Sequence, residues 1–558
     1  MLLSKRLCVC FVLLMSGGSL LASNLPPDHL RVHSTPSKKH HVSTKVTINR
    51  FKIEGNCHIE SKKLERLLKP FKNKKLNIYE LHQAADVITN YYHSQGYFTA
   101  RTFIPPQPIK NHTLHLIVVE GYLDSLHGIR IESNGKRVNP DFAYHLLNKI
   151  LKPGTVFTQK KLERALLLLN DVPGMESSAV LYPGEKIGAG RLHVNLYDEP
   201  LIHGNLTTNN FGYVPTGRYE LGVSLYIDNP FKHGSQFIFQ GVQTDKDLTY
   251  SYGSFTLPVS YTGLRAGVEG SYTRFGANSI LAAVPDSSGN ANLKSGFLDY
   301  TIIRQRSHNL YGIAKLTNYR LYDYNNGITL DRRTLNYITL NLIGNWRDQF
   351  GGNSVNTYGV SAHSGNLNLN GIQPYTSTDE STARTAGGFL VLDFSASRLQ
   401  SITNNFSTYW YLGGQIADKN LDPSQQYTLG GPYGVMGYPV GEALGDEGIN
   451  FHADIRYDYF NMPWHGDFQT ALIYSAGWVK LHKNSWNGWN AGNPIIQNTY
   501  TLQSLGLALS QSWSKYALLK FMVGRAVGAN PGRDLTAGNN VDGTSRKYQF
   551  WFEGTVYF

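Results

Sequence analysis

The C-terminal segment YQFWFEGTVYF, residues 548–558, decides the fold class. Large apolar side chains alternate along it with polar or small ones, and this period of two predicts an extended strand with one apolar face. Its length matches the roughly 9–11 residues that a tilted strand needs to cross a bilayer. The apolar set is Tyr548, Phe550, Phe552, Val556 and Phe558, and the opposite set includes Gln549, Glu553 and Thr555.

The same alternation continues through the whole region after residue 200. It is clear in TLQSLGLALSQ (501–511), ALLKFMVG (517–524) and STYWYLGGQIA (407–417), and many such segments end in Tyr or Trp, as strands do at membrane interfaces. We expect no helices here and about 14–18 strands of about ten residues. A soluble β-sandwich or β-helix is the alternative, but the apolar faces are too numerous for one thin core. Residues 201–558 are therefore predicted to form a transmembrane β-barrel.

The N-terminus predicts an exported protein. MLLSKRLCVCFVLLMSGGSLLASN (1–24) has basic residues, a short apolar run and small residues, which is typical of a signal peptide over residues 1–22. Cys8 and Cys10 lie within it, so Cys57 would remain as a small packing residue without a disulfide partner. No later apolar run approaches the roughly 18 residues of a membrane helix.

Residues 23–45 are polar, contain prolines and show no periodicity, so they predict a linker. We expect neither a metal site at its histidines nor a helix that plugs the barrel. The net charge of +12 is concentrated in the N-terminal third. In an exported protein this charge is interpreted as solvated surface, and no nucleic-acid partner is expected. The linker histidines are His29, His33, His40 and His41.

Two small α+β units precede the predicted barrel. The first, residues 46–121, begins with the strand VTINRFKIEGN, contains a helix capped by Asn77 and Glu80, and closes with the strand LHLIVVEG. The second, residues 122–200, repeats this order, with helices beginning after Asn139 and Thr158. A tandem repeat of small units is typical of binding or scaffold modules. The expected buried positions of the last helix are Leu162, Ala165, Leu166 and Leu169.

The glycine-rich segment LGGPYGVMGYPVGEALGDEG, residues 429–448, raises the question of a nucleotide site. A phosphate-binding loop requires Gly-Lys-Ser or Gly-Lys-Thr, which is absent from the segment. Nor does the sequence contain a recognisable metal-ligand set, nucleophile elbow or pair of catalytic carboxylates. We therefore expect neither an enzyme nor a cofactor.

Several motifs resemble those of the TpsB transporters of two-partner secretion, the haemolysin secretion/activation protein family within the outer-membrane barrel-assembly superfamily. NYYHSQGY (90–97) and IPPQ (104–107) are similar to the first polypeptide-transport-associated (POTRA) domain of that family, and residues 429–448 resemble its lumen loop. IYSAGWVKLHKN (473–484) resembles the facing strand. The resemblance implies two periplasmic POTRA domains, over residues 46–121 and 122–200, and a barrel of about 16 strands in the Gram-negative outer membrane.

The resemblance also implies functional residues and one departure from the family pattern. TpsB loops usually read Val-Arg-Gly-Tyr or Val-Arg-Ala-Tyr, and their strand reads Tyr-Asp-Ala-Gly; here Met436 and Ser475 replace the arginine and the aspartate. Because both partners of an enclosed ion pair are absent, we hypothesise that Met436 packs against Ser475 and the barrel wall. The implied residues are Gly431, Val435, Met436, Gly437 and Tyr438 in the loop, Ser475 and Gly477 on the strand, Tyr97, Pro106 and Gln107 in the first POTRA domain, and Phe558 as the terminal insertion signal.

Other residues of the loop and the first POTRA domain have two interpretations. Glu442, Asp446 and Glu447 either position the loop or form a solvated acidic turn, and Tyr97, Pro106 and Gln107 either carry function or serve packing and turns. The loop segment itself is either the tip that enters the lumen or an ordinary surface loop. The sequence leaves these alternatives open.

The resemblance implies transport of one large, unfolded, β-rich exoprotein of the TpsA type, an adhesin, a haemolysin, a haem-binding protein or a contact toxin. Strand edges in residues 46–199 would capture it by β-augmentation. Further expected partners are outer-membrane lipids and, during biogenesis, the barrel-assembly machinery. The alternatives are an insertion factor for other outer-membrane proteins and a passive porin or receptor.

Overall fold

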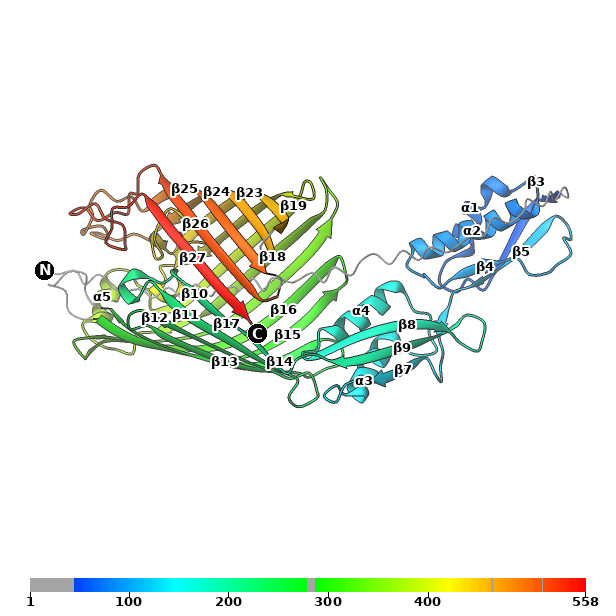
Figure 1. Ribbon diagram of the computed structural model, residues 1–558, viewed down its shortest axis with the longest axis horizontal. Coiled ribbons are helices and arrows are strands. Elements are labelled where there is room, and N and C mark those ends of the chain that lie inside the picture. The colour runs from blue at the N-terminus through cyan, green and yellow to red at the C-terminus, as the bar shows by residue number, and fades with distance from the viewer. Residues whose placement is uncertain (1–44, 278–286, 463–465, 514) are drawn as a thin grey trace.

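The computed structural model describes residues 45–277, 287–462, 466–513 and 515–558, and it places two small α+β units at one end of a large barrel (Figure 1). The predicted signal peptide, nearly all of the linker, Cys8, Cys10 and the four linker histidines lie outside the described residues. In the described part of the chain, no helix is both long and apolar enough to cross a bilayer.

The first unit has a mixed three-stranded sheet in the order β2-β5-β4, in which β2 is parallel and β4 antiparallel to β5, and a separate antiparallel pair of β1 and β3. Helix α2 begins with the predicted capping box: the Asn77 side chain accepts from the Glu80 N–H at 2.9 Å, and Glu80 accepts from the Asn77 N–H at 2.7 Å. The elements of the first unit are β1 (Val46–Ile48), β2 (Arg50–Glu54), α1 (Ser61–Leu67), η1 (Lys69–Phe71), β3 (Lys74–Leu76), α2 (Ile78–Ser94), β4 (Arg101–Phe103) and β5 (Thr113–Val119).

The interpretation of Cys57 as a packing residue was wrong, because its side chain is exposed. It lies in a turn in which the Asn56 side-chain amide donates to the Ile59 carbonyl at 2.8 Å. Ile59, not Cys57, points into the core of the first unit. The turn thus directs the neighbouring isoleucine inward and leaves the thiol in solvent.

The second unit has β9 at the centre of its sheet, with β7 and β6 parallel on one side and β8 antiparallel on the other. Asn139 and Thr158 cap its helices as predicted. Leu162 and Leu166 are only partly buried, whereas Leu168 is buried in the core of the unit, and its side chain also lies close to Gly263 of the barrel rim. The elements are β6 (Tyr122–Leu123), β7 (Ile129–Ser133), α3 (Pro140–Leu151), α4 (Gln159–Asn170), β8 (Met175–Pro183) and β9 (Ala189–Asp198).

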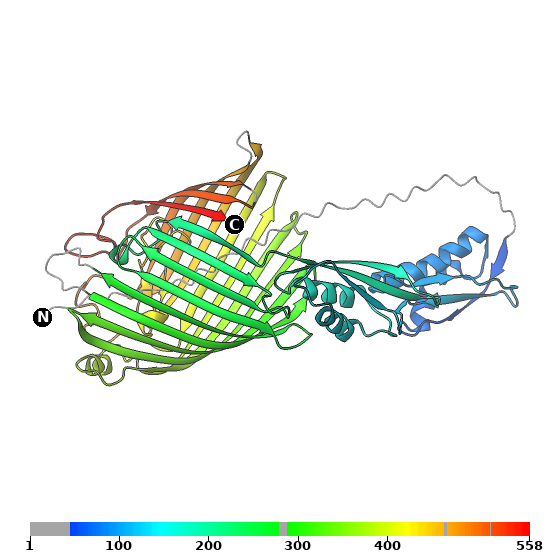
Figure 2. The same cartoon turned by 60° about the horizontal axis from the view of Figure 1, so that its bottom comes forward.

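The remaining described residues form a closed antiparallel barrel of 16 strands, which confirms the predicted fold class (Figures 1 and 2). The barrel closes where β27 pairs with β10, and Phe558 exchanges two backbone hydrogen bonds with Gly204, at 3.0 and 2.9 Å. The strands are β10 (Ile202–Asn209), β11 (Glu220–Asp228), β12 (Gln236–Thr244), β13 (Thr249–Pro258), β14 (Leu264–Ala277), β15 (Ser287–Arg304), β16 (His308–Asn325), β17 (Ile328–Asp348), β18 (Ser354–Asn368), β19 (Gly387–Ser401), β20 (Phe406–Ala417), β23 (Glu447–Met462), β24 (Gly466–Lys480), β25 (Thr499–Trp513), β26 (Ala517–Val527) and β27 (Tyr548–Tyr557).

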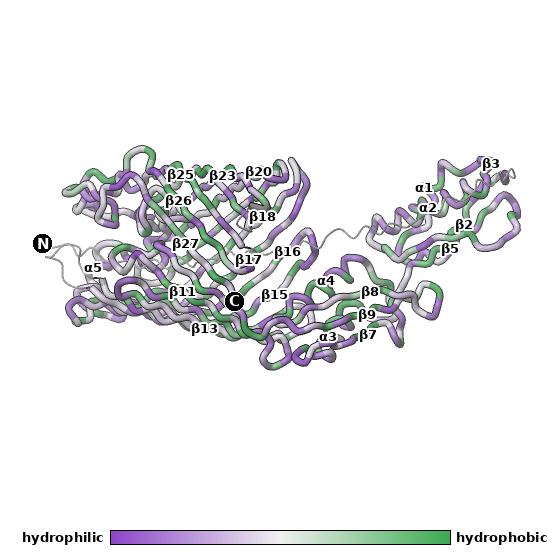
Figure 3. The backbone as a smooth tube through the Cα atoms, in the orientation of Figure 1, coloured by the Kyte–Doolittle hydropathy of each residue, from purple (hydrophilic) through white to green (hydrophobic). Residues whose placement is uncertain are grey.

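Alternation along the strands follows the sequence pattern. Leu507, Phe521 and Phe550 are 55%, 56% and 63% exposed on the outer face, and apolar and polar positions alternate along the wall (Figure 3). The expected strand length of about ten residues was too short for β15–β17, which reach 21 residues because they extend beyond the apolar band. The absence of helices was also wrong: α5 (Tyr375–Ser381) lies between β18 and β19.

The second unit is fixed to the near rim of the barrel. The Arg164 guanidinium on α4 donates to the carbonyls of Thr301, Thr262 and Ile302 at 2.7, 3.2 and 3.1 Å. Arg304 of β15 forms two 2.7 Å hydrogen bonds with the Asp171 carboxylate at the end of α4. The two-unit arm therefore meets the barrel at the end where β15 finishes (Figure 2).

Candidate functional site

The segment between β20 and β23, residues 418–446, is called the lumen loop here because it is packed against the inner wall of the barrel. It contains η3 (Pro423–Gln425) and a hairpin of β21 (Tyr427–Thr428) and β22 (Leu444–Gly445). The tip reverses tightly: the Val435 N–H donates to the Leu429 carbonyl at 2.7 Å, and Gly431 adopts φ +121°, which favours glycine. Leu429, Val435 and Met436 are completely buried, so the ordinary surface loop is excluded.

Met436 docks on the wall through neutral contacts. Its N–H donates to Ser475 Oγ at 3.3 Å, and its carbonyl accepts from Trp551 Nε1 at 2.9 Å. Ser475 Oγ also lies 2.7 Å from Ser504 Oγ, so the buried hydroxyl has a second partner. The Met436 side chain packs with Ala471, Ile473, Ala508, Met522 and Trp551. The hypothesised contact with Ser475 is present, and it is formed by the Met436 backbone, while the side chain contacts the apolar wall.

Glycines in β25 and β26 allow this close approach. A Cβ on Gly506 would lie 2.3 Å from Met436 Sδ, and one on Gly524 would lie 2.5 Å from the Met436 carbonyl oxygen. In the same way, a Cβ on Gly477 would lie 2.6 Å from Leu429 of the loop. The wall therefore has a surface of bare backbone against which the tip lies. Sequence analysis found Gly477 but missed Gly506 and Gly524, which stand in ordinary alternating strands.

The three acidic residues after the tip hold the loop to the barrel and do not form a solvated turn. Glu442 accepts from the Asn530 side chain at 2.8 Å and the Val541 N–H at 2.9 Å. Asp446, which has no exposed surface, accepts from the N–H groups of Leu421 and Lys483 at 3.0 and 2.7 Å. Burial raises the pKa of the Asp446 carboxyl to about 6 and also raises the pKa of Glu442.

Glu447, the third acidic residue, begins β23 and pairs with Lys483 at 2.6 Å. On the other side of the loop tip, the Tyr433 hydroxyl donates to Glu553 of β27 at 3.0 Å, and the Lys520 ammonium lies 5.2 Å from the centre of the Tyr433 ring. The loop is therefore held by polar contacts along its length as well as by Met436.

A buried ion cluster anchors the first part of the loop. Arg333 of β17 donates to Asp422 of the loop at 2.8 Å and to Asp331 at 3.0 Å, and it also contacts Asp323. Arg333 and Asp422 are 8% and 1% exposed at their side chains, so this pair is enclosed. Sequence analysis missed the cluster, because Asp422 lies 89 positions from Arg333 and no motif joins the four residues.

The POTRA-motif residues lie in the first unit, apart from the lumen loop. The Tyr97 ring packs 5.7 Å from Tyr92, and Gln107 exchanges hydrogen bonds with the His115 backbone at 2.8 and 2.9 Å. Pro106 is exposed in the turn that Gln107 fixes. These contacts favour the interpretation of packing and turn formation.

Comparison with known proteins identifies the family. Residues 188–495 match the family described as haemolysin secretion/activation protein ShlB/FhaC/HecB, and residues 46–121 match the ShlB-type POTRA domain. The chain belongs to this haemolysin secretion/activation family. Its barrel is an outer-membrane transporter of the two-partner secretion type, with the POTRA region in the periplasm.

Curated relatives and solved structures agree with this family. The heme/hemopexin transporter protein HuxB of Haemophilus influenzae strain 86-028NP is 24% identical over 502 residues, which cover 89% of this chain and 84% of the relative. The outer membrane transporter CdiB of Dickeya dadantii is 23% identical and covers 73% and 71%. The structure of CdiB from Escherichia coli has a TM-score of 0.73 at 19% identity, covers 94% and 93% of the two chains, and so shares the fold.

Proposed function

We propose that this transporter captures one unfolded, β-rich exoprotein in the periplasm and passes it through the barrel to the cell surface or the medium. The docked lumen loop is the observation that carries this proposal, because it occupies the route through the barrel and has discrete contacts that can be released. We assign residues 46–121 and 122–200 to two POTRA domains and residues 201–558 to the barrel. Folding of the cargo outside would prevent its return, so no nucleotide or cofactor is required.

Cargo recognition would use strand edges of the arm. In the first unit, β2 and β4 are the outer strands of their sheet, and in the second unit β8 pairs only with β9. An extended cargo segment can add to such an edge through backbone hydrogen bonds, which tolerate many sequences. Capture of unfolded chain by β-augmentation is consistent with a cargo that folds only after export.

We infer that the residues of the loop tip and the facing strand act as a neutral docking device in the transport cycle. Gly431 and Gly437 provide the tight turn, Val435, Met436 and Tyr438 fill the contact, and Ser475 and Gly477 form its wall. The terminal Phe558 would serve as the insertion signal that the barrel-assembly machinery recognises. Its backbone bonds to Gly204 support a role at barrel closure.

The deciding experiment deletes the gene for this chain and measures the amount of the exoprotein in the culture medium. The candidate cargo would be a large secreted protein, sought first among the products of neighbouring genes. Transport predicts that the exoprotein is lost from the medium of deletion cells and restored by the wild-type chain. Release from deletion cells, or retention in wild-type cells, would contradict the proposal.

A second candidate is insertion of other barrel proteins through the β10–β27 seam. The seam favours it because only five residue pairs join β10 to β27, whereas nine pairs join β26 to β27. Under that function, depletion would lower the level of many outer-membrane proteins. Under the transport function, only the partner exoprotein would be affected.

A further inference from the structure

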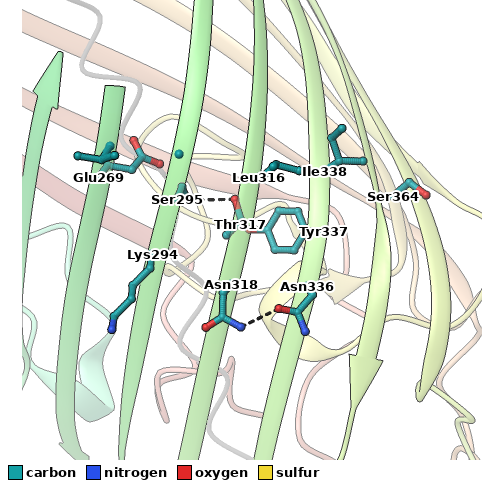
Figure 4. A pocket seen from close by; sticks show the side chains of 12 residues that line it. Glu269, Lys294, Ser295, Leu316, Thr317, Asn318, Asn336, Tyr337, Ile338 and Ser364 are labelled. Atoms are coloured by element: carbon teal, nitrogen blue, oxygen red, sulfur yellow. Dashed lines mark hydrogen bonds between the residues drawn. The ribbon is translucent and has the colours of Figure 1, made fainter. Parts of the chain in front are cut away.

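The outer wall of β14–β17 changes from apolar to polar between two neighbouring rows of residues. Cross-strand neighbours on the outer face form rows, and the register places Val268, Gly296, Leu316 and Ile338 in the last apolar row. The next row, away from the POTRA units, contains Lys294, Asn318 and Asn336, and Figure 4 shows these three beside Leu316 and Ile338. Asn318 donates to Asn336 at 2.7 Å along this row.

Two further outward rows continue the polar surface with more cations. Arg320 of β16 lies opposite Asn292 and Thr334 in the second row. Arg274 of β14 and Arg332 of β17 lie in the third row, two residues further along their strands. We call Arg274, Lys294, Arg320 and Arg332 the outer basic patch; all four are exposed. On β14–β18 the three rows contain no aspartate or glutamate. The first row is Gly270, Lys294, Asn318, Asn336 and Asn366; the second is Tyr272, Asn292, Arg320, Thr334 and Asn368; the third is Arg274, Asn290, Tyr322 and Arg332.

Cations on the inner face of the same strands form ion pairs with carboxylates. Lys315 pairs with Glu269 at 2.6 Å, and Arg333 is surrounded by carboxylates. Among the residues that the structure describes, no ion pair is formed by any member of the outer basic patch. The Arg332 guanidinium instead lies 5.5 Å from the centre of the outward Tyr322 ring. Within the described part of the chain, the patch therefore presents positive charge without a carboxylate partner on the outward wall.

Spacing suits a headgroup that carries more than one anionic group. Neighbouring strands are about 4.8 Å apart and a two-residue step is about 6.8 Å, so Lys294, Arg320 and Arg332 succeed one another at intervals on the order of 8 Å. Lys294 lies in the first row beyond the last apolar row, and Arg320 and Arg332 lie in the second and third, so the patch begins where acyl chains end and headgroups begin. Cations at this level attract anionic headgroups.

We propose that the outer basic patch binds a phosphorylated lipid headgroup of the outer leaflet. Lys294, Arg320 and Arg332 would contact its phosphates, Arg274 would extend the positive field, and the asparagines between them would donate hydrogen bonds to its sugar or phosphate oxygens. Binding would fix the β14–β17 side of the barrel against the membrane. This inference concerns the outer wall and does not depend on what passes through the lumen.

The test measures lipid binding to the purified full chain in detergent. The probe is lipid A with two phosphates, compared with the same lipid after phosphate removal, by native mass spectrometry and by the shift in melting temperature. We expect wild type to bind the phosphorylated lipid at least tenfold more tightly. The combined variant Lys294→Gln, Arg320→Gln, Arg332→Gln should lose at least tenfold of that affinity, since each cation near a headgroup contributes about fivefold.

Single variants supply the matched comparison. Arg320→Gln should lose about fivefold, whereas Arg525→Gln, which removes an exposed outward cation on β26, should bind as wild type does. Arg320→Gln also carries the test if the combined variant does not fold. The proposal would be overturned if wild type bound both lipids equally or if Arg320→Gln bound the phosphorylated lipid as wild type does. It would also be overturned if free pyrophosphate competed for the patch as well as the lipid does, or if an acidic polypeptide bound in place of the lipid.

Discussion

The backbone N–H of Met436 donates to Ser475 Oγ at 3.3 Å, at the two positions that correspond, by resemblance to the TpsB motifs, to an arginine and an aspartate. The contact is completely buried on both sides. Loss of one partner of an enclosed ion pair leaves an unpaired charge, whereas loss of both can be neutral when the site is well packed. Here the serine hydroxyl satisfies a loop N–H, and the methionine side chain fills the space beside the wall. The chain therefore docks its loop tip without an ion pair at this position.

A double-mutant cycle tests this docking. Met436→Arg should undock the loop, because it buries a guanidinium without a carboxylate at a cost of about 3–5 kcal/mol, and Ser475→Asp should bury an unpaired carboxylate. The double variant should recover much of the lost exoprotein secretion, while Met436→Leu, which conserves volume, should secrete normally. If Met436→Arg secretes normally and Ser475→Asp adds nothing to it, the proposed docking is wrong.

Gly524 provides an independent test, because its missing side chain makes room for the Met436 backbone. In Gly524→Ala the new Cβ would meet the Met436 carbonyl oxygen at 2.5 Å, so the loop tip must move away. We expect more frequent open events in planar-bilayer recordings and faster cleavage of the loop by added protease. Gly296→Ala is the control, because a Cβ there meets nothing within 4 Å. Equal conductance of the two variants would show that the tip does not block the pore.

Local patterns predicted the parts of the fold that depend on neighbouring residues. Alternation around Phe550 gave the outward face of β27, and the pair Asn77 and Glu80 gave the start of α2, because both signals act within a few positions. The prediction for Cys57 was wrong because no such local signal determines whether its side chain is buried. Its burial depends on the direction of one turn, and composition does not specify that direction.

The anchors of the lumen loop depend on barrel register and could not be predicted locally. Arg333 meets Asp422 only because the base of the loop folds back over the inner face of β17–β19, although the two residues are 89 positions apart in the chain. The need for a glycine at position 524 likewise follows only from the position of the loop, because nothing in its own strand distinguishes it from another small residue. The resemblance indicated which loop mattered, but the replacement of its ion pair by wall packing required the structure.

Arg333 should be essential for barrel stability as well as for the loop. Arg333→Met removes the cation shared by Asp323, Asp331 and Asp422, so the free energy of unfolding in lipid vesicles should fall by about 3–5 kcal/mol. Arg347→Met, on the same strand at an exposed position, should change it by less than about 0.5 kcal/mol. Urea titration followed by heat-modifiable gel mobility measures both. Similar losses in the two variants would contradict an anchoring role.

Loop docking should strengthen in mild acid through Asp446. Its pKa is about 6 in the docked loop against an ordinary value of 3.8, so the docked state takes up a proton first as the pH falls. Docking should therefore tighten as the pH falls from about 6 to about 4 and be weakest, with no further dependence on pH, above that range, so channel openings should be rarer at pH 5 than at pH 7. Asp446→Asn should reduce this dependence and leave the part that Glu442 contributes in the same direction, whereas Asp418→Asn, at an exposed position of the loop, should retain it in full. More openings in acid would reverse the sign and refute the assignment.

The joint between the second unit and the barrel should depend more on Arg164 than on Asp171. Arg164 donates to three rim carbonyls, so its loss removes three hydrogen bonds at once, whereas the Asp171–Arg304 pair is partly exposed and contributes about 1 kcal/mol or less. Arg164→Leu should therefore speed protease cleavage near residues 199–201 and lower secretion, with a smaller effect from Asp171→Asn. Lys160→Leu on the exposed side of the same helix is the control. A joint that loosens without loss of secretion would contradict the expectation that secretion needs a rigidly docked arm.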